Sequence, residues 1–187
     1  MTSFREVFLC DWTQQFCPIA VSASSARNMK KQQKKEAYQL ALKQIDSVLE
    51  GESHIVLKMA TINCILRENL PYYFWTGFYL VHKGDLIVGP YQGTMGCLHI
   101  AFGKGVCGTA AQERKTQIVP DVNKFPGHIA CDSKSASEIV VPVFNKNKEL
   151  IAVFDVDSTD VASFDEIDKE YLEKILENHF FKAKLVY

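Results

Sequence analysis

The centre of the chain reads WTGFYLV over residues 75–81, HKGD over residues 82–85 and LIVGPY over residues 86–91. The two outer runs are rich in aromatic and branched side chains, which favour strands, and the short polar linker with its glycine is typical of a hairpin turn. We therefore predict two antiparallel strands here. Turn-forming and strand-forming residues predict four more strands, over residues 98–102, 116–119, 138–144 and 150–156.

Helical periodicity flanks this region on both sides. Apolar residues recur at steps of three and four over residues 36–49 and 55–66, which predicts two amphipathic helices, the second capped by Ser53. A short helix is expected over residues 107–113, and Ser163 with Glu166 forms the capping-box pattern of a closing helix. This order predicts an α+β fold: a largely antiparallel sheet with helices packed on one face.

The chain has 187 residues, of which 47% are hydrophobic, and its 21 basic and 22 acidic side chains leave a net charge of -1. This composition is typical of one globular domain, and the balanced charge does not favour binding to nucleic acid or to an anionic membrane. No apolar run approaches the roughly 18 to 20 residues that cross a bilayer, and a secretory signal is not recognisable at the N-terminus. We therefore expect a cytoplasmic protein.

Residues 1–30 differ in composition from the remainder of the chain. A Ser/Ala-rich run over residues 22–26 leads into a lysine cluster over residues 30–35. Such a shift indicates a boundary, so we predict a partly disordered N-terminal extension over residues 1–30 and a folded domain over residues 31–187.

Six cysteines in a chain without an export signal are expected to be reduced thiols. Cys97, Cys107 and Cys131 lie in glycine-containing segments that read as turns or loops, where reactive groups usually sit. Their arrangement points to thiol redox chemistry. Cys64 lies in an apolar helical stretch and is expected to be a buried structural residue.

Seven segments together resemble one known family. They are WTGFY (75–79), GPYQG (89–93), GVCGTA (105–110), VPDV (119–122), FPGHIACD (125–132), SEIVVP (137–142) and DVDS (155–158). The set resembles the free methionine-R-sulfoxide reductases, which are single-domain enzymes of the GAF fold. The resemblance implies that residues 31–187 form a GAF-like catalytic domain that reduces free L-methionine-(R)-S-oxide to L-methionine under oxidative stress. It implies no cofactor and no metal, and thioredoxin as the reductant.

The chemistry can also be argued from the residues. Reducing a sulfoxide needs a thiolate to attack sulfur, a proton for the departing oxygen, and a second thiol to convert the sulfenic acid into a disulfide. The three loop cysteines supply the thiols. Asp155 and Asp157 are two residues apart on one strand, so they project from the same face, where like charge raises the pKa of one carboxyl. Either Glu138 or Asp157 would then donate the proton.

Further roles follow from the resemblance and stay partly open. Cys131 is the attacking thiol by resemblance, and Cys97 is the resolving one. Cys107 is the alternative nucleophile, because a position at the start of a helix would lower its pKa. Trp75 would enclose the substrate methyl group. The carboxylates not used as the acid, among Glu138, Asp155 and Asp157, would receive the substrate amino group.

Other functions compete with this interpretation. Cys97 with His99, or Cys131 with His128, lacks the paired spacing of a zinc site, so no metal is expected. A Cys-His protease would not need three cysteines and an acid cluster. A non-enzymatic GAF sensor of a small molecule and a thiol redox switch stay open, and a homodimer is compatible with the sequence.

Overall fold

The computed structural model describes residues 29–129 and 131–183. The first helix begins at Lys31, and the predicted extension lies outside the described residues except for Met29 and Lys30. The division of the chain at residue 30 therefore stays a prediction.

Six strands form one antiparallel sheet in the order β3-β2-β1-β6-β5-β4. They are β1 (Trp75–His82), β2 (Asp85–Gln92), β3 (His99–Ala101), β4 (Gln117–Val119), β5 (Ser137–Phe144) and β6 (Leu150–Ser158). All six predicted strands are present, with boundaries shifted by one or two residues. The helices are α1 (Lys31–Val48), α2 (Ile55–Asn69), α3 (Gly105–Glu113) and α4 (Glu166–Phe180), with a 3-10 turn η1 (Val122–Lys124).

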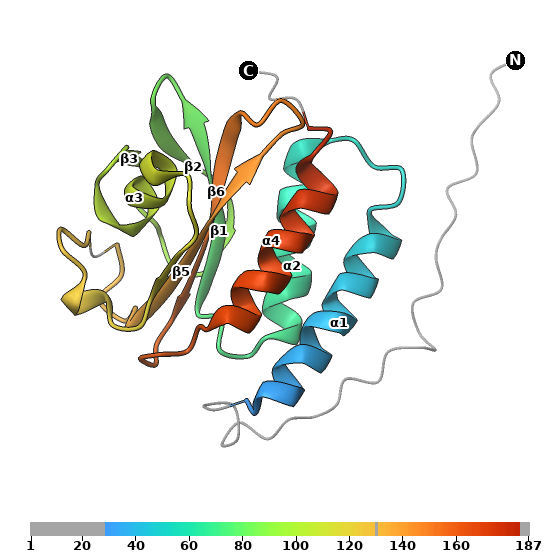
Figure 1. Cartoon of the computed structure of the whole chain (residues 1–187), viewed down its shortest axis with the longest axis horizontal. Helices are drawn as coiled ribbons and strands as arrows, with labels where there is room; N and C mark the ends of the chain where they lie inside the picture. The colour runs from blue at the N-terminus through green and yellow to red at the C-terminus, as the bar shows by residue number, and fades with distance from the viewer. Residues whose placement is uncertain (1–28, 130, 184–187) are drawn as a thin grey trace, which may run out of the picture.

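The sheet separates two hydrophobic cores (Figure 1). Helices α1, α2 and α4 cover one face, where Phe78 and Phe154 are fully buried against them. Alternate residues on the same strands, such as Tyr79 and Val153, belong to the second core on the opposite face, beside α3. The α+β prediction is confirmed, and the short helix α3 lies apart from the other three, on the face that holds the cysteine loops.

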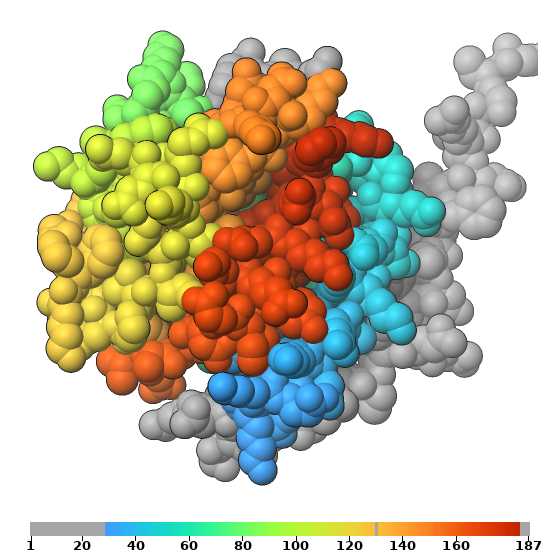
Figure 2. Space-filling view, in the orientation of Figure 1, coloured from blue at the N-terminus to red at the C-terminus, as the bar shows by residue number. Residues whose placement is uncertain are grey.

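A buried ionic cluster joins the first helix to the last. The ammonium of Lys34 lies 2.6 Å from Asp168 and 3.2 Å from Asp165, and the Tyr38 hydroxyl donates to the same Asp168 carboxylate. The space-filling view shows α1 and α4 packed together on this side of the molecule (Figure 2). Because Lys34 and Asp168 are both buried and paired, their contact fixes the position of α1 against α4.

Helix α1 begins five residues and α3 two residues before the predicted start, and two predicted helix caps are wrong by one or two residues. The cap of α2 is His54, whose Nδ1 accepts from the Leu57 amide, and not Ser53. The cap of α4 is Asp165, because its carboxylate accepts from the Ile167 amide, whereas the Ser163 hydroxyl is engaged with Ser158 and Asp160 in the preceding turn. Both predictions assumed that a serine beside the helix would be free to bond its backbone.

The prediction for Cys64 is also wrong, since it is exposed. The face of α2 that packs into the core carries Met59, Ile62 and Leu66, and Cys64 lies on the outer side. Within the described part of the chain, no helix is long and apolar enough to span a membrane.

Candidate active site

Two loops meet on the α3 side of the sheet and are joined covalently. Cys97, which follows β2, and Cys131, which lies between η1 and β5, form a disulfide with Cα atoms 5.5 Å apart. A second link joins the same loops, because the Thr94 hydroxyl donates to the Asp132 carboxylate. The structure therefore pairs the two cysteines to which the resemblance assigned attack and resolution.

A small cavity of about 40 Å³ lies beneath these loops, enough for more than one water-sized group. Six of the seven predicted site residues line it, and the seventh, Cys97, is bonded to one of them. The six are Trp75, Cys107, Cys131, Glu138, Asp155 and Asp157. Residues from β1, α3, β5 and β6, which are far apart in the sequence, thus converge on one place.

Strand pairing gathers the three acids. Glu138 of β5 lies opposite Asp157 of β6, and Asp155 lies two residues from Asp157 on the same strand, so all three face the cavity. The prediction that Asp155 and Asp157 share a face is confirmed.

The environment of these acids favours their protonated forms. Burial, reinforced by the neighbouring carboxylates, raises the pKa of Glu138 and of Asp155 well above the usual range. Burial and the charge of Asp132 raise the pKa of Asp157 to about 7, against a hydrogen bond from Ser135 that lowers it. These shifts favour the protonated carboxyls, and a pKa of about 7 allows Asp157 to act as a general acid near neutral pH.

Cys107 occupies the third position of α3, and its side chain is buried against the acids. Its Sγ lies 3.9 Å from Oε1 of Glu138. Burial raises the pKa of the Cys107 thiol well above its ordinary value, and the charges of Asp155 and Glu138 raise it further. The prediction that the helix start would lower this pKa is wrong, because burial against two carboxyl groups disfavours a thiolate more than the helix dipole favours it.

Trp75 forms the apolar wall of the cavity. Its ring stacks on Tyr79 at 5.8 Å and on Tyr91 at 5.3 Å between centroids, and its Nε1 donates to the Thr94 carbonyl at 2.9 Å. Only 3% of Trp75 is exposed. The indole is therefore held in one orientation, in which it lines the cavity.

Gly77 makes this arrangement possible. A Cβ atom at this position would lie 2.4 Å from the Tyr91 Cβ and 2.5 Å from the Trp75 ring, closer than real atoms approach. Gly77→Ala should displace the indole and lower the free energy of unfolding by about 1–3 kcal/mol, the usual cost of overpacking. Urea denaturation and near-ultraviolet circular dichroism of the aromatic rings measure the two effects.

Gly84→Ala is the matched control for this substitution. Nothing lies within 4 Å of its added methyl group, and its φ of +89° introduces backbone strain alone. We expect it to lower stability without altering the aromatic signal. An unchanged aromatic signal in Gly77→Ala would contradict the role given to this glycine.

Several cavity residues were not assigned a role in this site from the sequence, and two of them have polar groups next to the predicted site residues. Tyr79 lines the cavity beside Trp75, and the strand periodicity that placed Trp75 could have placed it too. His128 lies in the Cys131 loop, with Nε2 3.9 Å from Oε2 of Glu138, and burial lowers its pKa. The proximity of His128 to Glu138 depends on how the loop folds over the sheet, which no local pattern indicates.

Known proteins resemble this chain in sequence and in structure. The family model described as the GAF domain matches residues 70–178. GAF domain-containing protein A of Dictyostelium discoideum is 50% identical over 144 residues, which cover 76% of this chain and 90% of that protein. The free methionine-R-sulfoxide reductase of Escherichia coli is 38% identical over 143 residues, covering 76% of this chain and 86% of that protein.

A solved structure extends the comparison. The X-ray structure of free methionine-R-sulfoxide reductase from Neisseria meningitidis, in complex with its substrate, matches with a TM-score of 0.74 and 44% sequence identity. The match covers 79% of this chain and 90% of that one. The fold and the sequence match those of these relatives, and the paired cysteines fit the resemblance. The chain therefore belongs to the free methionine-R-sulfoxide reductase family of GAF-domain proteins.

Proposed function

We propose that this protein reduces free L-methionine-(R)-S-oxide to L-methionine. The observation that carries the proposal is the Cys97 to Cys131 disulfide beside a cavity lined by three protonatable acids. A sensor that only binds a small molecule needs no such cysteine pair. A thiol switch without substrate does not need the buried acids, whose isolation from water costs stability.

The proposed reaction begins on the reduced protein. The Cys131 thiolate attacks the sulfoxide sulfur and forms a transient S–S bond while Glu138 or Asp157 protonates the oxygen. The hydroxyl then passes from the substrate sulfur to the Cys131 sulfur as the S–O and S–S bonds break, so methionine leaves and Cys131 becomes a sulfenic acid. The Cys97 thiol then attacks the Cys131 sulfur, which releases water and forms the disulfide. Two thiols are oxidised and one sulfoxide is reduced, so the electrons balance. Cys107 stays the alternative nucleophile, although its burial and its raised pKa favour Cys131.

Recognition of the substrate follows from the polarity of the cavity. Trp75 offers apolar surface for the methyl group, and Asp155, Asp157 and Glu138 line the same cavity. An ammonium group near these acids would favour their ionised forms and pair with them. This accounts for a free amino acid as substrate.

The form of the substrate provides a test. We expect the R epimer of free methionine sulfoxide to be reduced, and the S epimer and the N-acetylated amino acid to be refused, because blocking the amino group removes the charge that the acids receive. Chromatographic measurement of methionine released with dithiothreitol as reductant checks this. Equal turnover of the N-acetyl compound would contradict the proposed pocket, and no turnover of either epimer would contradict the proposed function.

Thioredoxin is the reductant that we propose. Cys131 is exposed in the disulfide-bonded form, and the apolar residues Met95, Leu98 and Ile129 are exposed in the same two loops. An external thiol can thus approach the Cys131 sulfur, and a protein partner would find apolar surface around it.

A cytoplasmic location and a homodimer are also proposed. A cytoplasmic location would provide the reducing thiols that the reaction consumes. Exposed apolar residues of α1 and α2, Leu40, Val48, Val56 and Leu57, would supply the dimer surface.

A further inference from the structure

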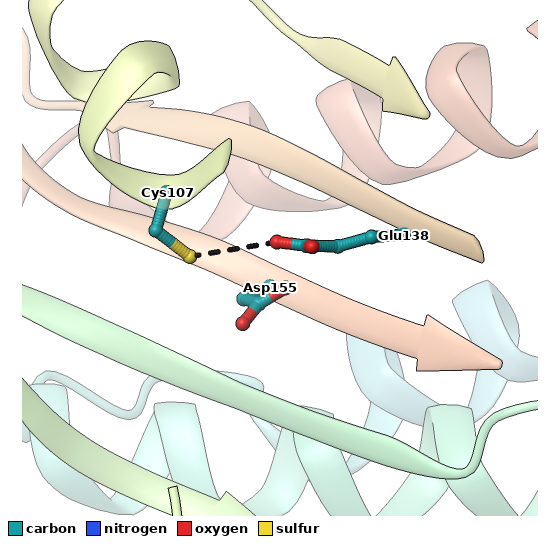
Figure 3. A group of neighbouring side chains, drawn as sticks. All are labelled: Cys107, Glu138 and Asp155. Carbon is teal, nitrogen blue, oxygen red and sulfur yellow. Dashed lines mark hydrogen bonds between the residues drawn. The ribbon is translucent and has the colours of Figure 1, made fainter. Parts of the chain in front are cut away.

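Three side chains from three separate elements point toward one another inside the cavity. Cys107 comes from α3, Glu138 from β5 and Asp155 from β6 (Figure 3). One ligand atom of each, the thiol sulfur or a carboxylate oxygen, lies within 4.8 Å of the other two. All three residues are at least 94% buried. Donor atoms of these types at this spacing could hold a metal ion.

The cluster lacks a buried positive charge among the described residues. The basic residues that line the cavity are Lys104, which is exposed, and His128, whose pKa is lowered. The Oδ1 atom of Asp155 is buried and has no hydrogen-bond partner in the part of the chain that the structure describes. Buried carboxyl groups are normally hydrogen-bonded, paired or coordinated to a metal, so the unpartnered oxygen of Asp155 is available to accept a metal ion.

We propose that this cluster binds Zn²⁺ through the Cys107 thiolate, Glu138 and Asp155, with water in the fourth position. Zinc accepts a mixed set of sulfur and carboxylate ligands in a tetrahedron, whereas Mg²⁺ and Ca²⁺ require six or more oxygen ligands and do not favour sulfur. The spacing rules applied to the sequence look for pairs of ligands on one element. They could not find a site assembled from α3, β5 and β6.

Two properties follow from the ligands. Zinc binding must displace the protons of the thiol and the carboxyls, so the affinity should increase as the pH rises. The metal would also bind Glu138 and Asp155, which are among the acids proposed to bind the substrate amino group. Zinc and substrate should therefore exclude each other. This second property rests on the proposed function, whereas the binding of zinc does not.

The test uses the full chain in its disulfide-bonded form, in which Cys97 and Cys131 cannot bind metal or turn over substrate. A background of Cys10→Ser, Cys17→Ser and Cys64→Ser leaves Cys107 as the sole free thiol. We expect Co²⁺ to produce a thiolate-to-metal charge-transfer band and Zn²⁺ to bind once per chain by calorimetry. Added free methionine-R-sulfoxide should weaken the binding of zinc.

Two variants of that background identify the ligands. Cys107→Ser should remove the band and weaken zinc binding by about 100-fold or more, since loss of groups that only orient a ligand already costs 10- to 100-fold. Asp155→Asn keeps the shape of the side chain and should weaken binding while retaining the band. Glu170→Gln, an exposed acid on α4, is the matched control and should change nothing.

The possible outcomes distinguish the proposed zinc site from the proposed reductase function. A charge-transfer band that survives Cys107→Ser, or zinc affinity unchanged in both Cys107→Ser and Asp155→Asn, would overturn the metal site. The absence of saturable zinc binding in a protein with intact reductase activity would also overturn it. Zinc binding in a protein without reductase activity would overturn the proposed function and leave the metal site standing.

Discussion

Cys131→Ser protein should release no methionine from free methionine-R-sulfoxide, even in a single turnover at high enzyme concentration. If Cys131 attacks the sulfoxide, its replacement leaves no suitable thiol in the cavity, because Cys97 does not line it and Cys107 is buried with a raised pKa. Rapid quenching followed by chromatographic measurement of methionine gives the result.

Cys97→Ser is the informative partner of this variant. It retains the attacking thiol, so it should release about one equivalent of methionine per site and then stall as the sulfenic acid. Wild-type protein treated with substrate and no reductant should carry the Cys97 to Cys131 disulfide, which mass spectrometry of its peptides detects. A burst that is retained in Cys131→Ser and lost in Cys107→Ser would make Cys107 the nucleophile.

Of Glu138→Gln and Asp157→Asn, the variant that removes the proton donor should lower kcat by about 100-fold or more, with a smaller change in KM. The amide keeps the shape of the acid and removes its proton. Glu170→Gln, on the exposed side of α4, should retain full activity. Unaltered turnover in both Glu138→Gln and Asp157→Asn would show that the proton comes from another group.

The pH profile identifies which acid donates. A donor works in its protonated form, so its contribution is present below its pKa and is lost as the pH rises through it. With a pKa of about 7, Asp157 as donor should make the single-turnover rate fall above pH 7, and this fall should vanish in Asp157→Asn. With Glu138 as donor, whose pKa burial also raises, the fall should persist in Asp157→Asn and vanish in Glu138→Gln.

The local periodicity of the sequence was sufficient to predict part of the site. Alternation along a strand predicted that Asp155 and Asp157 share a face, and the structure confirms this, because the side-chain period of a strand is fixed by its pleat. The position of Glu138 opposite Asp157 depends instead on the register between β5 and β6. The turn between these strands sets that register, and the acidic residues themselves do not indicate it.

Long-range packing accounts for the predictions that are wrong. The argument for a lowered Cys107 pKa considered the helix alone, whereas the decisive neighbours come from β5 and β6. Cys64 was predicted to be buried because its neighbours in the sequence are apolar. However, apolar residues occur around most of α2, and only the contacts of this helix with the sheet determine which side is buried. In both cases the deciding groups lie far away in the sequence.

The span between the two bonded cysteines links catalysis to the thermodynamics of folding. The disulfide closes a loop with a sequence separation of 34 residues, which includes α3, β4 and η1. In the chain-entropy model, a crosslink of this span stabilises a domain by roughly 3 to 5 kcal/mol through its effect on the unfolded chain. Because a typical domain is stable by only about 5–15 kcal/mol, each oxidation and reduction of this pair would shift a large part of the folding free energy. The reduced form, which awaits substrate, would then be the more easily unfolded and the more readily degraded state, so the supply of reductant would govern the lifetime of the protein as well as its turnover.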